Sequence, residues 1–195
     1  MPAKFTRLGS EYGGWDVALE AIPPGSTVLD LGVGHDTTFA EALQAHQPQT
    51  FVFIDPSPAC GEHIQTRGFI DWSFICAAAA KFNGPAQIFK NQQEGGSDSL
   101  RDDNLNNGWH KHQVEAVCLK QLIEHHQPSL VKMDVEGSEF DLWDDCIGVP
   151  QIAIEFHERL LSGKTERHKF EIVGRLAVHG YVPYVFGESI TFLRG

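Results

Sequence analysis

The sequence has no apolar run of the roughly 18 residues that a membrane-spanning helix needs. Its first seven residues also lack the apolar stretch of a signal peptide. The chain has only 4 cysteines and no C-x-x-C pair, so neither a metal knuckle nor a disulfide scaffold is indicated. We therefore expect a reduced, cytoplasmic protein with no membrane span.

Positive charge is scarce as well, because 15 Lys and Arg stand against 26 Asp and Glu and the formal net charge is −11. Proteins that bind nucleic acid neutralise its phosphates with Lys and Arg, so we expect no nucleic-acid partner. A neutral or cationic small molecule suits this balance better. The length of 195 residues, 42% of them hydrophobic, is enough for one core. We expect residues 1–195 to form a single domain.

Short β-branched and aromatic runs alternate along the chain with stretches of helical spacing. This alternation predicts an α/β fold with a mostly parallel, doubly wound, Rossmann-like sheet covered by helices on both faces. Near the C-terminus, only two residues separate the apolar runs 181–186 and 189–193. Parallel strands need a longer connection, so these two runs are expected to form an antiparallel hairpin.

Residues 84–113 differ from their surroundings because they are rich in Gly, Asn, Gln and Asp. A polar stretch of this length inside a compact domain is typical of a lid, a binding loop or a disordered segment. We interpret it as a loop or lid near the active site. The nearby pair His110 and His112, like His125 and His126, has no spaced partner and is expected on the surface.

The first predicted strand ends in a glycine-rich turn, Asp30-Leu31-Gly32-Val33-Gly34. Gly32 and Gly34 permit a tight turn and the close approach of a ligand to the backbone. Asp55 ends the second strand, where a carboxylate can accept hydrogen bonds from both hydroxyls of a ribose. Strand, G-x-G, helix, strand and terminal acid together indicate a nucleotide site at the carboxyl edge of the sheet.

A dinucleotide and S-adenosylmethionine both fit this pattern, and the charge of the turn distinguishes them. Asp30 precedes the glycines, Asp36 follows them, and Thr37 stands where a dinucleotide motif has its third glycine. These acids would repel a pyrophosphate, whereas they favour the ammonium and sulfonium groups of S-adenosylmethionine. We expect S-adenosylmethionine and disfavour a nicotinamide-dependent oxidoreductase. The structural alternative is that Asp36 only caps a helix.

A second group of polar residues follows two later predicted strands, namely Asp134, Glu136 and Glu139 after one, Glu155 and His157 after the other. These residues would face the transferable methyl group. Methyl transfer needs the acceptor hydroxyl held in line and its proton removed, so His157, Asp134 or Glu155 is the predicted general base. Asp134, Glu155 and His157 also offer oxygen and nitrogen ligands for a divalent metal. This is the less favoured alternative, and hydrogen bonding is their expected use.

Several of these segments resemble the FkbM-type S-adenosylmethionine-dependent methyltransferases. The matching segments are Val28-Leu29-Asp30-Leu31-Gly32, Phe53-Ile54-Asp55-Pro56-Ser57-Pro58, Gly96-Ser97-Asp98-Ser99-Leu100, Val131-Lys132-Met133-Asp134-Val135-Glu136-Gly137-Ser138-Glu139 and Ile154-Glu155-Phe156-His157. The Lys-x-Asp-x-Glu-Gly-x-Glu string is the most specific. The resemblance implies a class I methyltransferase fold, a seven-stranded sheet with an antiparallel last strand. It also implies O-methylation of a small-molecule, sugar or lipid-like hydroxyl.

The resemblance carries residue roles with it. The implied cofactor-binding residues are Asp30, Gly32, Gly34, His35, Asp36, Asp55, Pro56, Ala77 and Ala78. The implied catalytic residues are Asp134, Glu136, Glu155 and His157. The family usually has Gly in place of Asp36, which here either contacts the ammonium group or narrows the site. The alternative to an enzyme is a non-catalytic module that binds S-adenosylmethionine or a nucleotide. We also expect that the chain can form a homo-oligomer, in which a second subunit would cover the acceptor.

Overall fold

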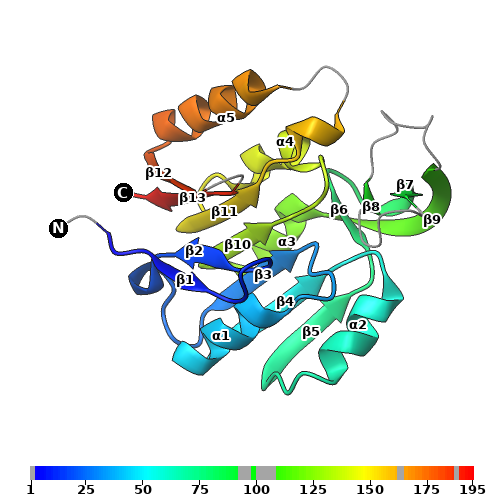
Figure 1. Ribbon diagram of the computed structural model, residues 1–195, viewed down its shortest axis with the longest axis horizontal. Helices are drawn as coiled ribbons and strands as arrows, with labels where there is room; N and C mark the ends of the chain where they lie inside the picture. The colour runs from blue at the N-terminus through cyan, green and yellow to red at the C-terminus, as the bar shows by residue number, and fades with distance from the viewer. Residues whose placement is uncertain (1–2, 92–97, 100–108, 162–164, 187–188) are drawn as a thin grey trace.

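The computed structural model describes residues 3–91, 98–99, 109–161, 165–186 and 189–195. Strands and helices alternate along these ranges (Figure 1). The strands are β1 (Thr6–Leu8), β2 (Trp15–Val17), β3 (Thr27–Leu31), β4 (Thr50–Ile54), β5 (Asp71–Ile75), β6 (Ala78–Ala80), β7 (Gly84–Asn91), β8 (Asp98–Ser99), β9 (Trp109–Cys118), β10 (Leu130–Met133), β11 (Gln151–Glu155), β12 (Tyr181–Phe186) and β13 (Ser189–Arg194). The α-helices are α1 (Thr38–His46), α2 (Pro58–Gln65), α3 (Leu119–His126), α4 (Glu139–Leu142) and α5 (Glu166–Val178), and the 3-10 helices are Leu19–Ala21, Trp143–Cys146 and Glu158–Leu160. Within the described ranges, no helix has the length and apolar character to cross a bilayer.

A seven-stranded sheet with the order β12-β13-β11-β10-β3-β4-β5 forms the centre of the molecule. The five strands from β11 to β5 are parallel, and β13 runs antiparallel to both of its neighbours. This arrangement confirms the predicted fold class, including the C-terminal hairpin. Pro183 lies in β12, an edge strand, which is where sheets tolerate proline. Strand order reverses at β3, so the ends of β3, β4, β10 and β11 form the edge where such folds bind ligands.

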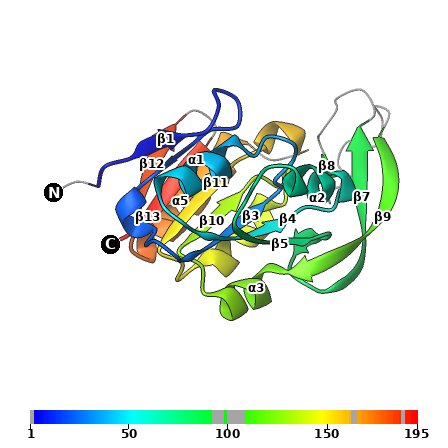
Figure 2. The same ribbon diagram turned by 90° about the horizontal axis from the view of Figure 1, so that it is seen from below.

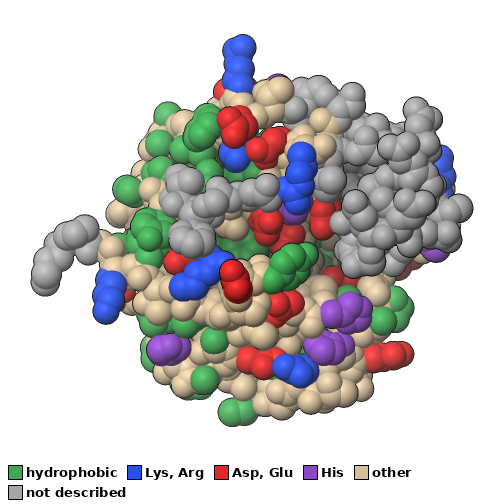
Figure 3. All heavy atoms as spheres, in the orientation of Figure 1, with side chains coloured by type: hydrophobic (Ala, Val, Ile, Leu, Met, Phe, Trp, Pro, Cys, Tyr) green, Lys and Arg blue, Asp and Glu red, His purple; other side chains and the backbone are tan. Residues whose placement is uncertain are grey.

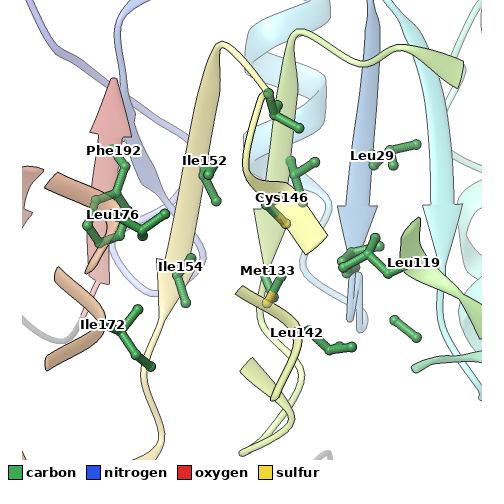
Figure 4. Packing of buried hydrophobic residues seen from close by; sticks show 14 of the residues in the cluster. Leu29, Leu119, Met133, Leu142, Cys146, Ile152, Ile154, Ile172, Leu176 and Phe192 are labelled. Atoms are coloured by element: carbon green, nitrogen blue, oxygen red, sulfur yellow. The ribbon is translucent and has the colours of Figure 1, made fainter. Parts of the chain in front are cut away.

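Alternate side chains of the central strands pack into two cores on opposite faces of the sheet. In β3, Leu29 and Leu31 join the core formed with α3, α4 and α5 (Figure 4), whereas Val28 joins the core formed with α1, α2 and β2. The strands β10 and β11 alternate in the same way. Strands buried on both faces consist of nearly continuous apolar residues, which is why these strands are visible in the sequence.

Residues 84–113 differ from the expectation of a loop or lid, because residues 84–91 and 109–113 lie in strands. β7 pairs antiparallel with β9, and together with β6 and β8 they form a separate four-stranded sheet beside the main one (Figure 2). Ile88 and Phe89 are buried in this hairpin. Strand formation here depends on cross-strand partners distant in sequence, which local periodicity does not reveal. Residues 92–97 and 100–108 lie outside the described residues, so a lid function stays a prediction.

The N-terminal residues form an antiparallel hairpin, β1–β2, that the sequence did not predict. Trp15 and Val17 bury their side chains in the core to which α1 also contributes. At the start of α1, Glu41 accepts a hydrogen bond from the residue that precedes the helix. Thr37 occupies the N-cap, and its hydroxyl donates to Glu41 Oε1 at 2.7 Å.

Candidate functional site

The turn after β3 has the conformation that its glycines were predicted to permit. Gly32 has a φ of +72° and Gly34 a φ of +57°, a region that favours glycine. A Cβ on Gly32 would lie 1.7 Å from the backbone oxygen of Asp134, so the turn packs directly on the end of β10. A Cβ on Gly34 would meet no atom within 4 Å. The first glycine is therefore required by packing, and the second leaves open space beside the backbone.

Asp55 connects this turn to the end of β4. Its Oδ2 accepts a hydrogen bond from the backbone N–H of Gly34 at 3.1 Å, and its Oδ1 accepts one from the N–H of Ser57 at 2.8 Å. Each carboxylate oxygen has a further lone pair for a ligand hydroxyl. Asp55 thus holds two loops at the position predicted for the ribose, and the ribose contact itself stays a prediction.

Asp30 lies inside the protein, where it forms an ion pair with Lys132. The Lys132 Nζ is 2.8 Å from Asp30 Oδ1, and both side chains are almost fully buried. The same amine donates to the backbone oxygen of Gly32 at 3.2 Å and lies 5.3 Å from the centre of the Trp15 ring. Burial disfavours the charge of the amine, but the carboxylates of Asp30 and Asp134 outweigh it and raise the pKa of Lys132. Through its hydrogen bond to Gly32, the ion pair holds the glycine turn in place. Contact between Asp30 and the cofactor stays a prediction.

Asp36 connects the N-terminal segment to the start of α1. Its Oδ2 accepts a hydrogen bond from the Ser10 hydroxyl at 2.7 Å, and its Oδ1 accepts from the N–H of Thr38 at 3.0 Å. Partial burial acts to raise the pKa of Asp36, but the hydrogen bonds from Thr38 and Ser10 lower it below its usual range. This is the structural alternative considered for Asp36, and its contact with an ammonium group stays a prediction.

The ends of β10 and β11 bring the four predicted catalytic residues together. Oxygens of Asp134, Glu136 and Glu155 lie 3.6, 3.5 and 3.9 Å from the Nε2 of His157. The His157 side chain is 4% exposed, whereas the three acids are between 22% and 29% exposed. Figure 3 shows acidic side chains gathered with a histidine in a hollow near the centre of this face.

Glu139 orients His157 from the protein interior. Its fully buried carboxylate accepts hydrogen bonds from the backbone N–H groups of His157 (2.6 Å) and Gly137 (2.8 Å), and its Oε1 lies 3.2 Å from His157 Nδ1. An Nδ1–H that donates to Glu139 leaves Nε2 facing the acids. Glu139 was expected to face the methyl group, but its side chain is fully buried, and its role in orienting His157 was not predicted. The available signal was its place at the end of the Lys-x-Asp-x-Glu-Gly-x-Glu string.

The carboxylates set the protonation of this cluster. Burial acts to lower the pKa of His157, but the hydrogen bond and charge of Glu139 and the charges of Glu136 and Asp134 raise it to about 9. Burial raises the pKa of Glu136 to about 7, and Asp134 adds to this effect while His157 opposes it. A protonated imidazole therefore balances part of the negative charge at neutral pH.

Of the remaining predicted residues, one lies in the turn between β3 and α1 and the others follow β4 and β5. His35 is exposed, Pro56 is partly buried, and Ala77 and Ala78 are buried. The Cys76 thiol approaches the backbone oxygen of Pro56 at 3.8 Å, which brings the two strand ends together. His112 and His125 are exposed as expected and His126 is partly buried, whereas the His110 side chain lies outside the described residues.

The sheet order and strand directions define a Rossmann-like α/β fold. No protein-family model matches the chain, and neither does any curated protein. Among solved structures, it is similar to precorrin-6Y C5,15-methyltransferase from Geobacter metallireducens, with 11% identity, a TM-score of 0.49 and coverage of 89% of this chain and 82% of that one.

Two further structures are similar at the same low level. One is an O-methyltransferase family protein from Burkholderia thailandensis, with 13% identity, a TM-score of 0.46 and coverage of 87% and 51% of the two chains. The other is the aminoglycoside resistance methyltransferase NpmB1, with 13% identity, a TM-score of 0.44 and coverage of 98% and 100%. Likeness at these identities concerns the fold alone, and the resemblance to the FkbM group stays a prediction.

Proposed function

We propose that the chain binds S-adenosylmethionine at the ends of β3 and β4 and transfers its methyl group to an acceptor held at the ends of β10 and β11. The contact between the two halves carries the proposal, because Gly32 packs so closely on the Asp134 backbone that a Cβ would come within 1.7 Å of it. A displacement at the methyl carbon needs donor and acceptor side by side and in line. The edge provides both positions next to each other.

The residues at the ends of β3 and β4 fit the cofactor. Gly34 leaves space beside the turn, and Asp55 offers carboxylate lone pairs between two loops. When bound, S-adenosylmethionine supplies an electrophilic methyl group on a positively charged sulfur. The preference for a cation, assigned from the sequence to Asp30 and Asp36, is better supplied by Asp134 and Glu136, which are partly exposed at the same edge.

The cluster at β10 and β11 fits a hydroxyl acceptor. A hydroxyl donates one hydrogen bond, and a carboxylate can accept that bond and then the proton. Asp134 and Glu155 remain candidate bases, whereas His157, protonated at neutral pH, can accept a proton only after it has lost its own. We propose a small-molecule, sugar or lipid-like hydroxyl as the acceptor, since the net charge of −11 disfavours a nucleic acid.

Calorimetric titration tests the cofactor assignment. S-adenosylmethionine and S-adenosylhomocysteine are expected to bind in the micromolar range, with NAD as a control that does not bind. Asp55→Ala should weaken both by about 1–3 kcal/mol, through the lost hydrogen bonds. A folded protein that binds neither compound would overturn the proposal.

Methyl-labelled cofactor and a panel of hydroxyl compounds test the chemistry. For any compound that becomes labelled, Asp134→Asn should lower turnover measured at saturating cofactor. Unchanged turnover would remove Asp134 from the mechanism. Retained cofactor binding without labelling of any compound would favour the non-catalytic module.

A further inference from the structure

We propose that Asp134, Glu136 and His157 form a binding site for a divalent metal ion. Hydrogen bonding, the use expected from the sequence, accounts poorly for the geometry. The oxygens of Asp134 and Glu136 lie 3.6 and 3.5 Å from His157 Nε2, beyond the range of about 2.7–3.2 Å of ordinary N–H···O bonds. One ring nitrogen carries at most one proton, so it cannot satisfy both acids, whereas a single cation between them can.

The spacing of the ligand atoms suits a metal ion. The three atoms all lie within 4.8 Å of one another. Metal–ligand bonds of about 2.1 Å place neighbouring ligands about 3 Å apart and opposite ligands about 4.2 Å apart. The atoms need to move inward by only about half an ångström each, and the acids, at 29% and 22% exposure, are accessible enough to do so.

The second observation is the way in which His157 is held. Histidines that bind metals almost always donate their other ring N–H to a carboxylate, a carbonyl or a water, which fixes the ring and its tautomer. Here the Nδ1 of His157 faces Glu139, whose carboxylate is held in turn by two backbone N–H groups. Nε2, on a side chain that is 4% exposed, therefore points into the cluster. This arrangement positions a nitrogen ligand in advance.

Charge and ligand type indicate the kind of metal. Carboxylate oxygens suit Mg²⁺ and Mn²⁺, and an imidazole nitrogen moves the preference toward the transition metal Mn²⁺. The nearby amine of Lys132 pairs with Asp30, and the positive charge beside Asp134 and Glu136 is that of the His157 imidazole. A bound metal ion would take the place of the proton on Nε2, because metal binding to histidine releases protons. If the proposed methyl transfer is correct, the ion would hold the acceptor oxygen beside the cofactor. Metal binding itself does not depend on that function.

Titration with Mn²⁺ tests the proposal, with the signal of free aqueous Mn²⁺ measured by electron paramagnetic resonance. The full chain is treated with chelator, dialysed and titrated without cofactor or acceptor. We expect one saturable micromolar site per chain, and Asp134→Asn should weaken it at least about tenfold. Asp144→Asn is the matched control, because it removes the same charge from an exposed acid paired with Lys81. Its affinity should stay within about twofold of the wild type.

Glu139→Gln tests the positioning of His157 and should weaken Mn²⁺ binding by about 10- to 100-fold. Its unfolding midpoint without metal reports any structural loss separately. Absence of saturable binding to the folded wild type, or equal affinities for the Asp134→Asn and Asp144→Asn chains, would overturn the site. Such a result leaves the proposed methyl transfer unaffected, whereas loss of S-adenosylmethionine binding alone would overturn the methyl transfer and leave the metal site standing.

Discussion

The two halves of the carboxyl edge use their acidic residues in opposite ways. At β3 and β4, Asp30 pairs with a lysine and Asp55 accepts two backbone N–H bonds. At β10 and β11, Asp134 and Glu136 converge on one imidazole nitrogen without reaching hydrogen-bond distance from it. The acids of the first half therefore build a rigid turn, while those of the second half retain capacity for a ligand.

The largest effect on stability is expected from removing Lys132, the lysine that pairs with Asp30 at the β3 and β4 half of the edge. Lys132→Met leaves the Asp30 carboxylate buried without its cation and should lower the free energy of unfolding by about 3–5 kcal/mol. Lys169→Met is the matched control, because Lys169 is also buried but its partner Glu158 is 19% exposed and stays hydrated. Denaturant unfolding measures both variants. Equal losses of unfolding free energy in the two variants would contradict the claim that burial makes the Asp30–Lys132 pair more important for stability.

A smaller effect separates the two glycines of the turn. Gly32→Ala adds strain at positive φ to a clash with the Asp134 backbone and should cost about 2–5 kcal/mol. Gly34→Ala adds only the strain and should cost about 1–2 kcal/mol. Thermal or denaturant unfolding distinguishes the two. A larger loss for Gly34→Ala would contradict the close packing of the turn on β10.

The smallest effect concerns the pH dependence of Asp36. Its pKa in the folded protein lies below the unfolded value of 3.8, because Thr38 and Ser10 hydrogen-bond its charged form. The stability it contributes is therefore fully present above that value and is lost as the pH falls through the lower folded pKa. The difference in unfolding free energy between the wild type and Asp36→Asn should be about 1 kcal/mol or less at pH 6. It should shrink below about pH 4, and a difference that grows on acidification would contradict the assignment.

The sequence predicted those parts of the fold whose cause is local. The apolar strand before Gly32, the turn itself and the short connection after Phe186 each follow from neighbouring residues. The hairpin of β7 and β9 was interpreted as a loop, because its partners are distant in the chain. The three-residue strands β1 and β2 are too short to show a period.

The sequence indicated which residues belong to the candidate site, but not which of them contact one another. Asp30 lies inside β3 and Asp55 follows β4, yet only the pairing register shows that Lys132 lies beside Asp30. A lysine and an aspartate, each inside an apolar strand, were the available signal for that pair. The role of Glu139 depends on backbone N–H groups that a sequence pattern does not position.

Hydrogen–deuterium exchange with saturating S-adenosylhomocysteine tests the central claim most directly, namely that the cofactor binds at the ends of β3 and β4. The account predicts slower exchange in the backbone amides of residues 32–36 and 55–57, and no change in α5, which packs on another part of the sheet. Protection confined to other segments, or no protection at a concentration that saturates the wild type, would contradict it.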